Sequence, residues 1–364
     1  MINSIQRYFI SHLNHNPILK KNLVQLIDFL FELRKMTVGN LTRNPAYLIH
    51  LLNSKVIAKP GTLSLGAIFN PGALSVGDRI LLLAKAQIVP WFKTRGEKRK
   101  FYLQGNAVSL YLDKNADSVL EQNILTTILG FPEENNWAIE DTRLFWWKEK
   151  KMVNHSLLIK GEVNGYLNQI SVLSALSVLD EKESTFTFCS LPQVDFPLQN
   201  FEKNWVYKAK GDDLLLFYSL NPFRVLKLED DKLFTFKTII NQQFTNKLND
   251  PGGFGTLVSL STNPIEYNEK YWLLIIHQIK YKISGRCYYQ WAVLINRQTL
   301  LPEKITSKPI FSGMGARGRT PGIRYISSII KHDNEILFFA GEGDVYVTVT
   351  KKPIKELECL FINF

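Results

Sequence analysis

Apolar residues recur near a 3.6-residue period through residues 1–36, which predicts helices at the start of the chain. Pro17 separates two of them, because proline has no N–H group with which to continue a helix. The second helix, in residues 22–35, has a broad apolar face that we expect to pack on the rest of the protein. Contact of this face with a membrane surface or a partner is the alternative.

From about residue 62 the pattern changes to short runs of β-branched and aromatic residues, separated by turns rich in Gly, Asn, Asp and Lys. Such runs predict many consecutive strands, and we expect only one short helix among them, near residues 118–129. Consecutive strands without long helices favour a sandwich, a barrel or a propeller over alternating βαβ units. The sequence shows no strict internal repeat that would choose among these folds.

The predicted strands fall into about five groups, as a five-bladed propeller requires, although a double sandwich fits the periodicity equally well. These groups lie near residues 62–112, 138–180, 184–230, 233–297 and 304–363. We therefore predict an all-β fold, a five-bladed β-propeller over residues 61–364, with an N-terminal helical extension over residues 1–60.

The composition is that of a folded globular chain, with 45% hydrophobic and 21% charged residues. Lys and Arg outnumber Asp and Glu by 44 to 33, a surplus that favours phosphates, nucleotides or an anionic surface as partners. No recognisable nucleic-acid-binding motif accompanies the charge, so we expect no nucleic-acid partner. The three cysteines are far apart and the N-terminus does not resemble a signal peptide, so we expect a cytoplasmic protein.

Two further patterns have weak chemical meaning. The G-x-G-x-x-G in residues 311–322 is followed by a proline and a strand-like run instead of a helix, so we predict no dinucleotide site. The basic run in residues 91–100 is most simply a solvated hairpin loop, with an anionic acceptor or a membrane contact as the alternative. The first of these loops carries arginines that could hold a phosphate, or could simply be solvated: Arg317, Arg319 and, just beyond, Arg324.

Polar residues beside the predicted strands form roughly one cluster in each strand group. Each could be a structural or turn residue, but in a propeller such positions can converge on the central channel, where ligands bind. The clusters contain Asn70, Asp141, Arg143, Lys203, Asn204, His277, Arg286, Tyr288, Tyr289 and Asp344.

The order of the motifs FNPGAL, IEDTR, EKNW, GGFGT, YWLLIIHQ and FFAGEGD resembles that of glycoside hydrolase family 130, the five-bladed propeller family of β-mannoside phosphorylases. The resemblance spans about residues 62–364. The chain resembles the related β-1,2-mannosyltransferases more than it resembles the phosphorylases. It implies an inverting glycosyltransferase that forms β-mannosidic linkages, expected to be β-1,2, from a phosphate-bearing donor such as GDP-mannose. The alternatives are a β-1,2-mannoside phosphorylase that uses inorganic phosphate or mannose 1-phosphate, a hydrolase, and a non-catalytic glycan-binding propeller.

The resemblance also implies roles for single residues. The family's general acid or base, the aspartate of its Glu-Asp-Pro-Arg motif, corresponds to Asp141. Asn70 corresponds to an asparagine that binds the mannosyl unit, and Asp344 to a late aspartate expected to bind sugar hydroxyls. The chain departs from the family at Thr142, where proline is usual, and at Lys85, where the phosphorylases have arginine.

One protein carboxylate suffices for such chemistry, because phosphate replaces the base-activated water of an inverting hydrolase. In the direction of transfer, Asp141 would act as general base toward the acceptor hydroxyl. We expect no metal or cofactor; the expected partners are a mannose-containing acceptor glycan and a sugar nucleotide or sugar phosphate donor. The full set of predicted substrate-binding residues is Asn70, Lys85, Glu140, Arg143, Lys203, Asn204, His277, Arg286, Tyr288, Tyr289 and Asp344, of which Arg143, Lys203 and Arg286 are the candidate phosphate ligands.

Overall fold

The computed structural model describes residues 53–363 apart from residues 66, 88–105, 126, 130–135, 164–165, 181–184, 244–256, 283–284, 314–315, 319 and 321. The helices predicted in residues 1–36, the basic run 91–100 and the GGFGT motif therefore lie outside the described residues. Among the residues described, no helix is long and apolar enough to cross a membrane.

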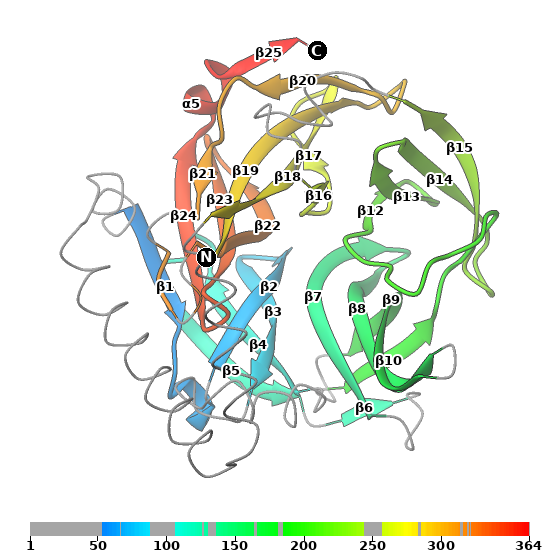
Figure 1. Cartoon of the computed structure of the whole chain (residues 1–364). Coiled ribbons are helices and arrows are strands. Elements are labelled where there is room, and N and C mark those ends of the chain that lie inside the picture. The colour runs from blue at the N-terminus through cyan, green and yellow to red at the C-terminus, as the bar shows by residue number, and fades with distance from the viewer. Residues whose placement is uncertain are drawn as a thin grey trace, which may run out of the picture.

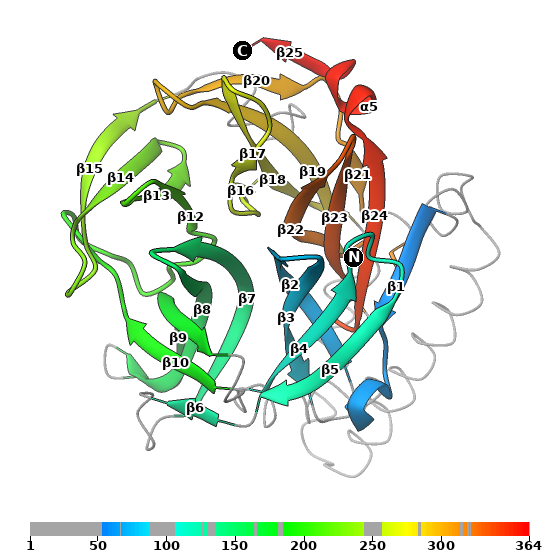
Figure 2. The same cartoon turned by 180° about the vertical axis from the view of Figure 1, so that it is seen from behind.

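Strands make up nearly all of the regular secondary structure in the described chain and form five sheets. The sheets are arranged around a central axis (Figure 1), and the view from behind in Figure 2 shows the same ring. The helices α5 (Ile354–Glu358) and η1 (Thr62–Ser64) are short. The prediction of an all-β fold is confirmed.

Each sheet begins with a strand near the axis, and most later strands pair antiparallel to their neighbours. From the axis outward, the first sheet consists of β2 (Ala67–Val76), β3 (Arg79–Gln87), β4 (Asn106–Asp113) and β5 (Val119–Leu125). The second consists of β7 (Asn136–Trp147), β8 (Lys150–Val163), β9 (Tyr166–Asp180), β10 (Thr185–Ser190) and the parallel strand β6 (Thr127–Leu129). The third consists of β12 (Val206–Lys210), β13 (Asp213–Leu220), β14 (Phe223–Asp230), β15 (Thr235–Gln242) and the parallel strand β11 (Gln193–Val194).

The two remaining sheets contain the C-terminal strands. The fourth consists of β16 (Leu257–Leu260), β18 (Tyr271–Lys282), β19 (Gly285–Asn296), β20 (Pro302–Thr306) and β25 (Phe361–Asn363), with β17 (Ile265–Glu266) on β18 and β21 (Phe311–Ser312) on β19. The fifth consists of β22 (Arg324–His332), β23 (Glu335–Glu342), β24 (Tyr346–Pro353) and β1 (Ser54–Ala58).

Five hydrophobic clusters pack neighbouring sheets together and close the ring. Leu83 and Leu157 share the cluster between the first and second sheets, and the next two clusters join the second sheet to the third and the third to the fourth. A further cluster joins the fourth sheet to the fifth. Leu82 and Leu337 then share the cluster that joins the fifth sheet to the first. Burial of apolar surface between all adjacent sheets therefore holds their inner strands around one axis.

The strand β1 adds backbone pairing to this closure. It pairs antiparallel with β24, so a segment from the N-terminal part of the described chain completes a sheet of C-terminal strands. β1 lies before residue 61, where the sequence predicted the propeller to begin.

The prediction of a short helix in residues 118–129 is wrong. This segment forms β5, which pairs with β4, and β6, which pairs with β10. A short apolar run of this kind fits either a helix or a strand. The strand is favoured here because the outer edge of β4 offers backbone hydrogen-bonding groups that an added strand can satisfy.

Candidate active site

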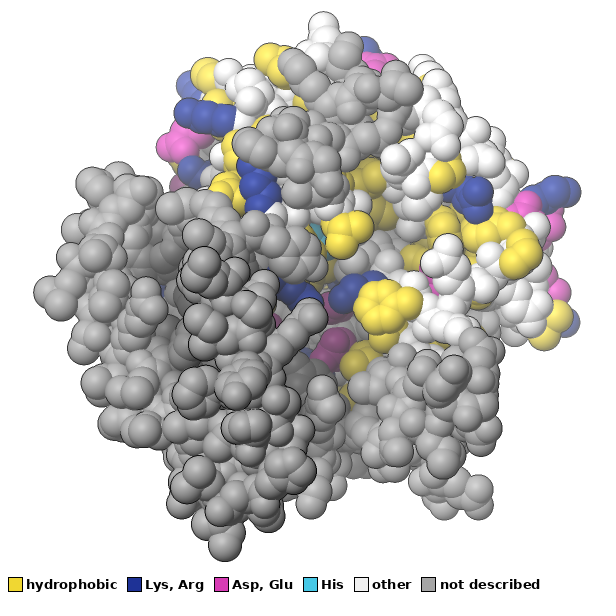
Figure 3. All heavy atoms as spheres, in the orientation of Figure 1, with side chains coloured by type: hydrophobic (Ala, Val, Ile, Leu, Met, Phe, Trp, Pro, Cys, Tyr) yellow, Lys and Arg dark blue, Asp and Glu magenta, His cyan; other side chains and the backbone are white. Residues whose placement is uncertain are grey.

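A cavity of about 690 Å³ lies at the axial end of the inner strands, and β2, β7, β16 and β22 all contribute to its wall. Figure 3 shows acidic and basic side chains close together in the central hollow of this face, next to apolar ones. A pocket of this size with a few convergent polar groups is the usual form of a small-ligand site.

Asp141 and Asn70 enter the cavity from interruptions in two neighbouring inner strands. Pairing of β7 with β8 stops at Glu140 and resumes at Arg143, so Asp141 lies in a bulge with φ 53°. Pairing of β2 with β3 stops at Phe69 and resumes beyond Asn70, which has φ 51°. Bulges redirect side chains out of the strand alternation. Here they bring Asn70 Nδ2 within 2.8 Å of Asp141 Oδ1, to which it donates a hydrogen bond.

Two glycines allow the backbones around this pair to approach closely. A Cβ atom on Gly72 would lie 2.9 Å from the Cα of Arg143. A Cβ atom on Gly341 would overlap Oδ1 of Asn70 and lie 2.7 Å from its backbone nitrogen. Since real Cβ atoms do not approach other atoms so closely, these positions require glycine for β2 to lie against β7 and β23.

Arg143 is buried and fixes the backbone around Asp141. Its guanidinium donates hydrogen bonds to the carbonyl of Asp141, at 2.9 Å, and to the carbonyl of Ser261. It also donates to the hydroxyl of Tyr325 and lies 3.5 Å from Oδ1 of Asn204. Arg143 therefore ties β7 to three other parts of the inner ring, from behind the cavity wall.

The two departures from the family pattern have structural partners in this chain. Lys85 is buried and forms an ion pair with Glu140, whose carboxylate lines the cavity. Thr142, in place of proline, donates a hydrogen bond from Oγ1 to the carbonyl of Leu83 at 2.6 Å. The hydroxyl of Thr142 thus ties the Asp141 bulge to β3.

His277 is held neutral beside the cavity. Burial, and then the nearby charges of Lys203 and Arg143, lower its pKa to about 3. Its Nδ1 lies 2.8 Å from Oγ of Ser261, and its ring stacks on Tyr288 with centroids 5.5 Å apart. At neutral pH His277 therefore offers hydrogen bonding without a charge.

The cavity wall carries both signs of charge. Lys203 and Arg286 line it together with Asp141 and Asp344. Burial, followed by the carboxylates of Asp141 and Asp344, raises the pKa of Tyr288 to about 12. The Tyr288 hydroxyl is therefore protonated at neutral pH and can donate a hydrogen bond to a ligand. Such a wall suits a ligand with both sugar hydroxyls and an anionic group.

The structure places most of the predicted residues in this wall. Those that line the cavity are Asn70, Glu140, Asp141, Lys203, Asn204, His277, Arg286, Tyr288 and Asp344. Lys85 and Arg143 lie behind this wall, where Lys85 contacts Glu140 and Arg143 contacts the Asp141 backbone. Tyr289 does not line the described cavity, because successive residues of β19 point to opposite faces of the sheet. Nζ of Lys280 lies 4.6 Å from the centre of the Tyr289 ring.

Several residues of the site escaped the sequence reasoning. Tyr325 lines the cavity and bonds to Arg143, but it occurs in an ordinary strand-like run that carries no chemical signal. Phe201 and Glu202 also line the cavity, immediately before the predicted Lys203 and Asn204. Glu202 is the first residue of the EKNW motif and Phe201 precedes it, so the motif could have suggested both. Within the described part of the chain, no group of three His, Cys, Asp or Glu residues could hold a metal ion.

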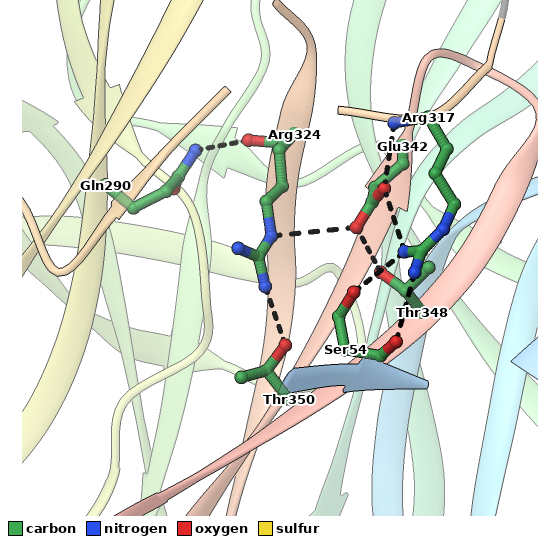
Figure 4. A network of polar contacts seen from close by, with 7 residues as sticks. All are labelled: Ser54, Gln290, Arg317, Arg324, Glu342, Thr348 and Thr350. Atoms are coloured by element: carbon green, nitrogen blue, oxygen red, sulfur yellow. Dashed lines mark hydrogen bonds and ion pairs between the residues drawn. The ribbon is translucent and has the colours of Figure 1, made fainter. Parts of the chain in front are cut away.

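Arg317 and Arg324, which the sequence offered as phosphate ligands or solvated residues, have a partner within the fold. Both approach the buried carboxylate of Glu342 (Figure 4), so their charges are already engaged within the fold. Arg319 lies outside the described residues.

No protein-family model and no curated protein sequence matches the chain. Solved structures do match. A β-1,2-mannobiose phosphorylase from Listeria innocua, in complex with β-1,2-mannobiose, has a TM-score of 0.57 at 14% identity, over 84% of this chain and 92% of that one. A glycosyl hydrolase from Bacteroides ovatus has a TM-score of 0.58 at 12% identity, over 80% and 85% of the two chains.

A GDP-Man-dependent mannosyltransferase from Leishmania mexicana also matches, with a TM-score of 0.53 at 10% identity over 83% of this chain and 91% of that one. At these identities the likeness concerns the fold. It agrees with the resemblance that the order of motifs indicated. The chain therefore has the β-propeller type of fold found in β-mannoside phosphorylases and in a GDP-Man-dependent mannosyltransferase.

Proposed function

We propose that the chain is an inverting mannosyltransferase that builds β-mannosidic linkages, β-1,2 in our assignment, from a phosphate-bearing donor such as GDP-mannose. The five sheets, each packed against two neighbours, would be the five blades of its propeller. The observation that carries the proposal is the position of Asp141. Asp141 is 7% exposed, it lines a cavity shared with cationic side chains, and Asn70 orients its carboxylate.

From the geometry of the cavity we propose the base and the groups that bind the donor. Oδ1 of Asp141 accepts the hydrogen bond from Asn70, and we assign Oδ2 to the acceptor hydroxyl. As the acceptor oxygen attacks C1 of mannose, the bond from C1 to the phosphate oxygen breaks and Asp141 takes the hydroxyl proton. Attack from the face opposite the phosphate converts an α-linked donor into a β-mannoside.

The leaving phosphate takes away the bonding electron pair and therefore gains negative charge. Lys203 and Arg286 are the cations in the cavity wall that we assign to it. Fixed positive charges in a partly enclosed site stabilise the charge that develops in the transition state more strongly than bulk water does. Because His277 stays neutral, it can bind a sugar or phosphate oxygen without adding to this charge.

A β-1,2-mannoside phosphorylase is the second candidate, favoured by the likeness to the phosphorylase from Listeria innocua. In that case inorganic phosphate would occupy the position beside Lys203 and Arg286 and attack C1. Asp141 would then protonate the departing sugar oxygen, so that the same residues would run the reaction in the opposite direction.

The two candidates differ in the donor that supports chain growth. We expect the purified full chain to extend β-1,2-mannobiose when GDP-mannose is supplied, with GDP released in equal amount to the mannose transferred. Chromatography of the sugars and of the nucleotide would measure both products.

Growth from mannose 1-phosphate alone, with breakdown of mannobiose in the presence of inorganic phosphate, would identify the phosphorylase instead. A chain that performs neither reaction, while it still binds mannobiose in calorimetry, would contradict both candidates and indicate a glycan-binding protein.

A further inference from the structure

The buried carboxylate of Glu342 lies between two arginines (Figure 4), and Asp344 follows two residues later in the chain. Arg317 Nη1 lies 3.3 Å from Glu342 Oε2, and Arg324 Nε lies 3.8 Å from Oε1. The hydroxyl of Thr348 donates to Oε1 at 2.9 Å, and the backbone N–H of Arg317 donates to Oε2 at 3.0 Å. A carboxylate buried so completely requires partners of this kind.

The two arginines extend the cluster into other strands. Arg317 donates to the hydroxyl of Ser54 at 2.7 Å and to its carbonyl at 3.1 Å, so it reaches β1. Arg324, on β22, donates to the hydroxyl of Thr350 on β24 at 2.7 Å. Burial lowers the pKa of Arg324 to about 10, so its guanidinium is still charged at neutral pH. The cluster therefore joins β1, β22, β23 and β24 to the loop that contains Arg317.

This loop lies directly on the turn that presents Asp344 to the cavity. Gly343 and Asp344 have φ 59° and 58°, both in the left-handed region. A Cβ atom on Gly343 would overlap the carbonyl oxygen of Arg317, so only glycine permits the contact. The N–H of Gly343 donates to Ile323 O at 2.9 Å, and the N–H of Thr320 donates to Gly343 O at 3.3 Å. The hydroxyl of Thr320 also lies 3.4 Å from Oδ2 of Asp344.

We propose that Glu342 and Arg317 are positioning residues, which clamp this loop against the turn and so fix Asp344 in the cavity wall. A left-handed aspartate is disfavoured in isolation and keeps its conformation only where the surroundings impose it. The contact of Arg317 with Glu342 supplies this restraint, because Glu342 begins the turn and Arg317 belongs to the loop stacked on it.

The carboxylate charge is the part of the clamp that can be removed with least change of shape. Glu342→Gln keeps the size of the side chain but leaves Arg317 and Arg324 without their shared counter-charge. Arg317 is partly accessible, so it can turn toward solvent, and the loop then loses its attachment to the turn. Arg317→Met breaks the same contact from the other side. Arg317→Lys retains a charge that can reach Glu342, so it should keep part of the attachment of the loop to the turn.

Hydrogen exchange tests the placement without any substrate. We expect the amides of Gly343 and Thr320 to exchange about tenfold faster in Glu342→Gln and Arg317→Met than in the wild type, because a buried charged contact is lost. Thr350→Val is the matched control, since it removes a buried hydrogen bond of the same cluster on the side away from the turn. It should lower stability without changing these two amides. Unchanged exchange in both clamp variants, or equal acceleration in the control, would overturn the proposal.

The consequence for sugar binding rests on the proposed function, and the exchange measurement does not. If Asp344 binds a sugar hydroxyl, the clamp variants should raise KM for the sugar substrate about tenfold with a smaller change in kcat, as expected for loss of uniform binding. Fast exchange with unchanged KM would refute this role of Asp344. A wild type that transfers no mannose would refute the proposed function, while the exchange rates would still decide whether the clamp exists.

Discussion

Four polar residues of the cavity wall adopt a left-handed backbone: Asn70, Asp141, Asn204 and Asp344, with φ between 51° and 66°. Such a conformation costs free energy in residues with a side chain, although Asn and Asp tolerate it best. At these positions it releases the side chain from the alternation of a strand and directs it into the cavity. The strain is therefore part of how the site is assembled.

The roles of single residues were only partly visible in the sequence. Asn70, Asp141 and Asp344, which the motifs singled out beside predicted strands, do line the cavity. The sequence did not reveal that Tyr289 faces away from the cavity, since that depends on the register of β19 with its neighbours. Nor did it reveal that Lys85 forms an ion pair with Glu140.

The buried histidines lead to a prediction for acid stability. Burial lowers the pKa of His277 to about 3 and that of His155 to about 4, against 6.5 in an exposed histidine. Between pH 6.5 and these values the unfolded chain binds protons that the native chain does not. The stabilising contribution is therefore complete above pH 6.5 and is lost as the pH falls.

From pH 6 to pH 5 we expect each histidine to reduce the free energy of unfolding by about 1 kcal/mol. His277→Gln should show a shallower fall over this interval than the wild type, by about that amount. Urea unfolding at both pH values measures the difference. If the wild type and the variant lose the same free energy, His277 does not remain neutral in the folded protein.

At the scale of elements, the site depends on how closely β2 can lie against β7 and β23. The close approaches at Gly72 and Gly341 press the backbone of the Asn70 bulge between the other two strands. Neither glycine has a positive φ, so each is needed for space and not for backbone conformation. A methyl group at these positions therefore acts on the site through packing.

Gly341→Ala tests this close packing. The added Cβ overlaps Asn70, so we expect Asn70 to move away from Asp141, with a loss of about 1–3 kcal/mol in stability and most of the activity. Gly77→Ala is the control: its φ of 60° also makes alanine unfavourable, but its Cβ would point into open space outside the site. It should lose a similar free energy of unfolding without losing activity. Equal activity in the two variants at equal stability would argue against the role of Asn70.

The strands were easier to predict than their pairing. Runs of β-branched and aromatic residues located most strands, because one or both faces of each are buried. The error at residues 118–129 arose where β5, at the outer edge of its sheet, has exposed Val119, Leu120 and Ile124 and thus lacks the usual alternation. In that segment only the pairing with β4 distinguishes a strand from a helix.

At the scale of the whole molecule, the ring brings together residues that are far apart in the chain. Asn70 and Asp141 come from adjacent sheets, and Asp344 comes from the fifth sheet, which packs against the first. The sequence predicted five strand groups but misplaced their limits: β10 belongs with the second sheet, and β15 with the third. Local patterns cannot show which neighbour an outer strand will join, because that is decided by contacts between distant segments.

The assay of Asp141→Asn tests the central claim most directly. Asn keeps the size of the side chain and can still accept the hydrogen bond from Asn70, but it cannot take a proton at neutral pH. Asp213→Asn, at an exposed ion pair with Lys227 that does not line the cavity, is the control for the same chemical change.

We expect Asp141→Asn to lower the rate of mannose transfer from GDP-mannose about 10²- to 10⁴-fold, the range that general base catalysis contributes. Binding of β-1,2-mannobiose, measured by calorimetry, should change little, and Asp213→Asn should transfer mannose at the wild-type rate. A folded Asp141→Asn variant that transfers mannose as fast as the wild type would contradict the account.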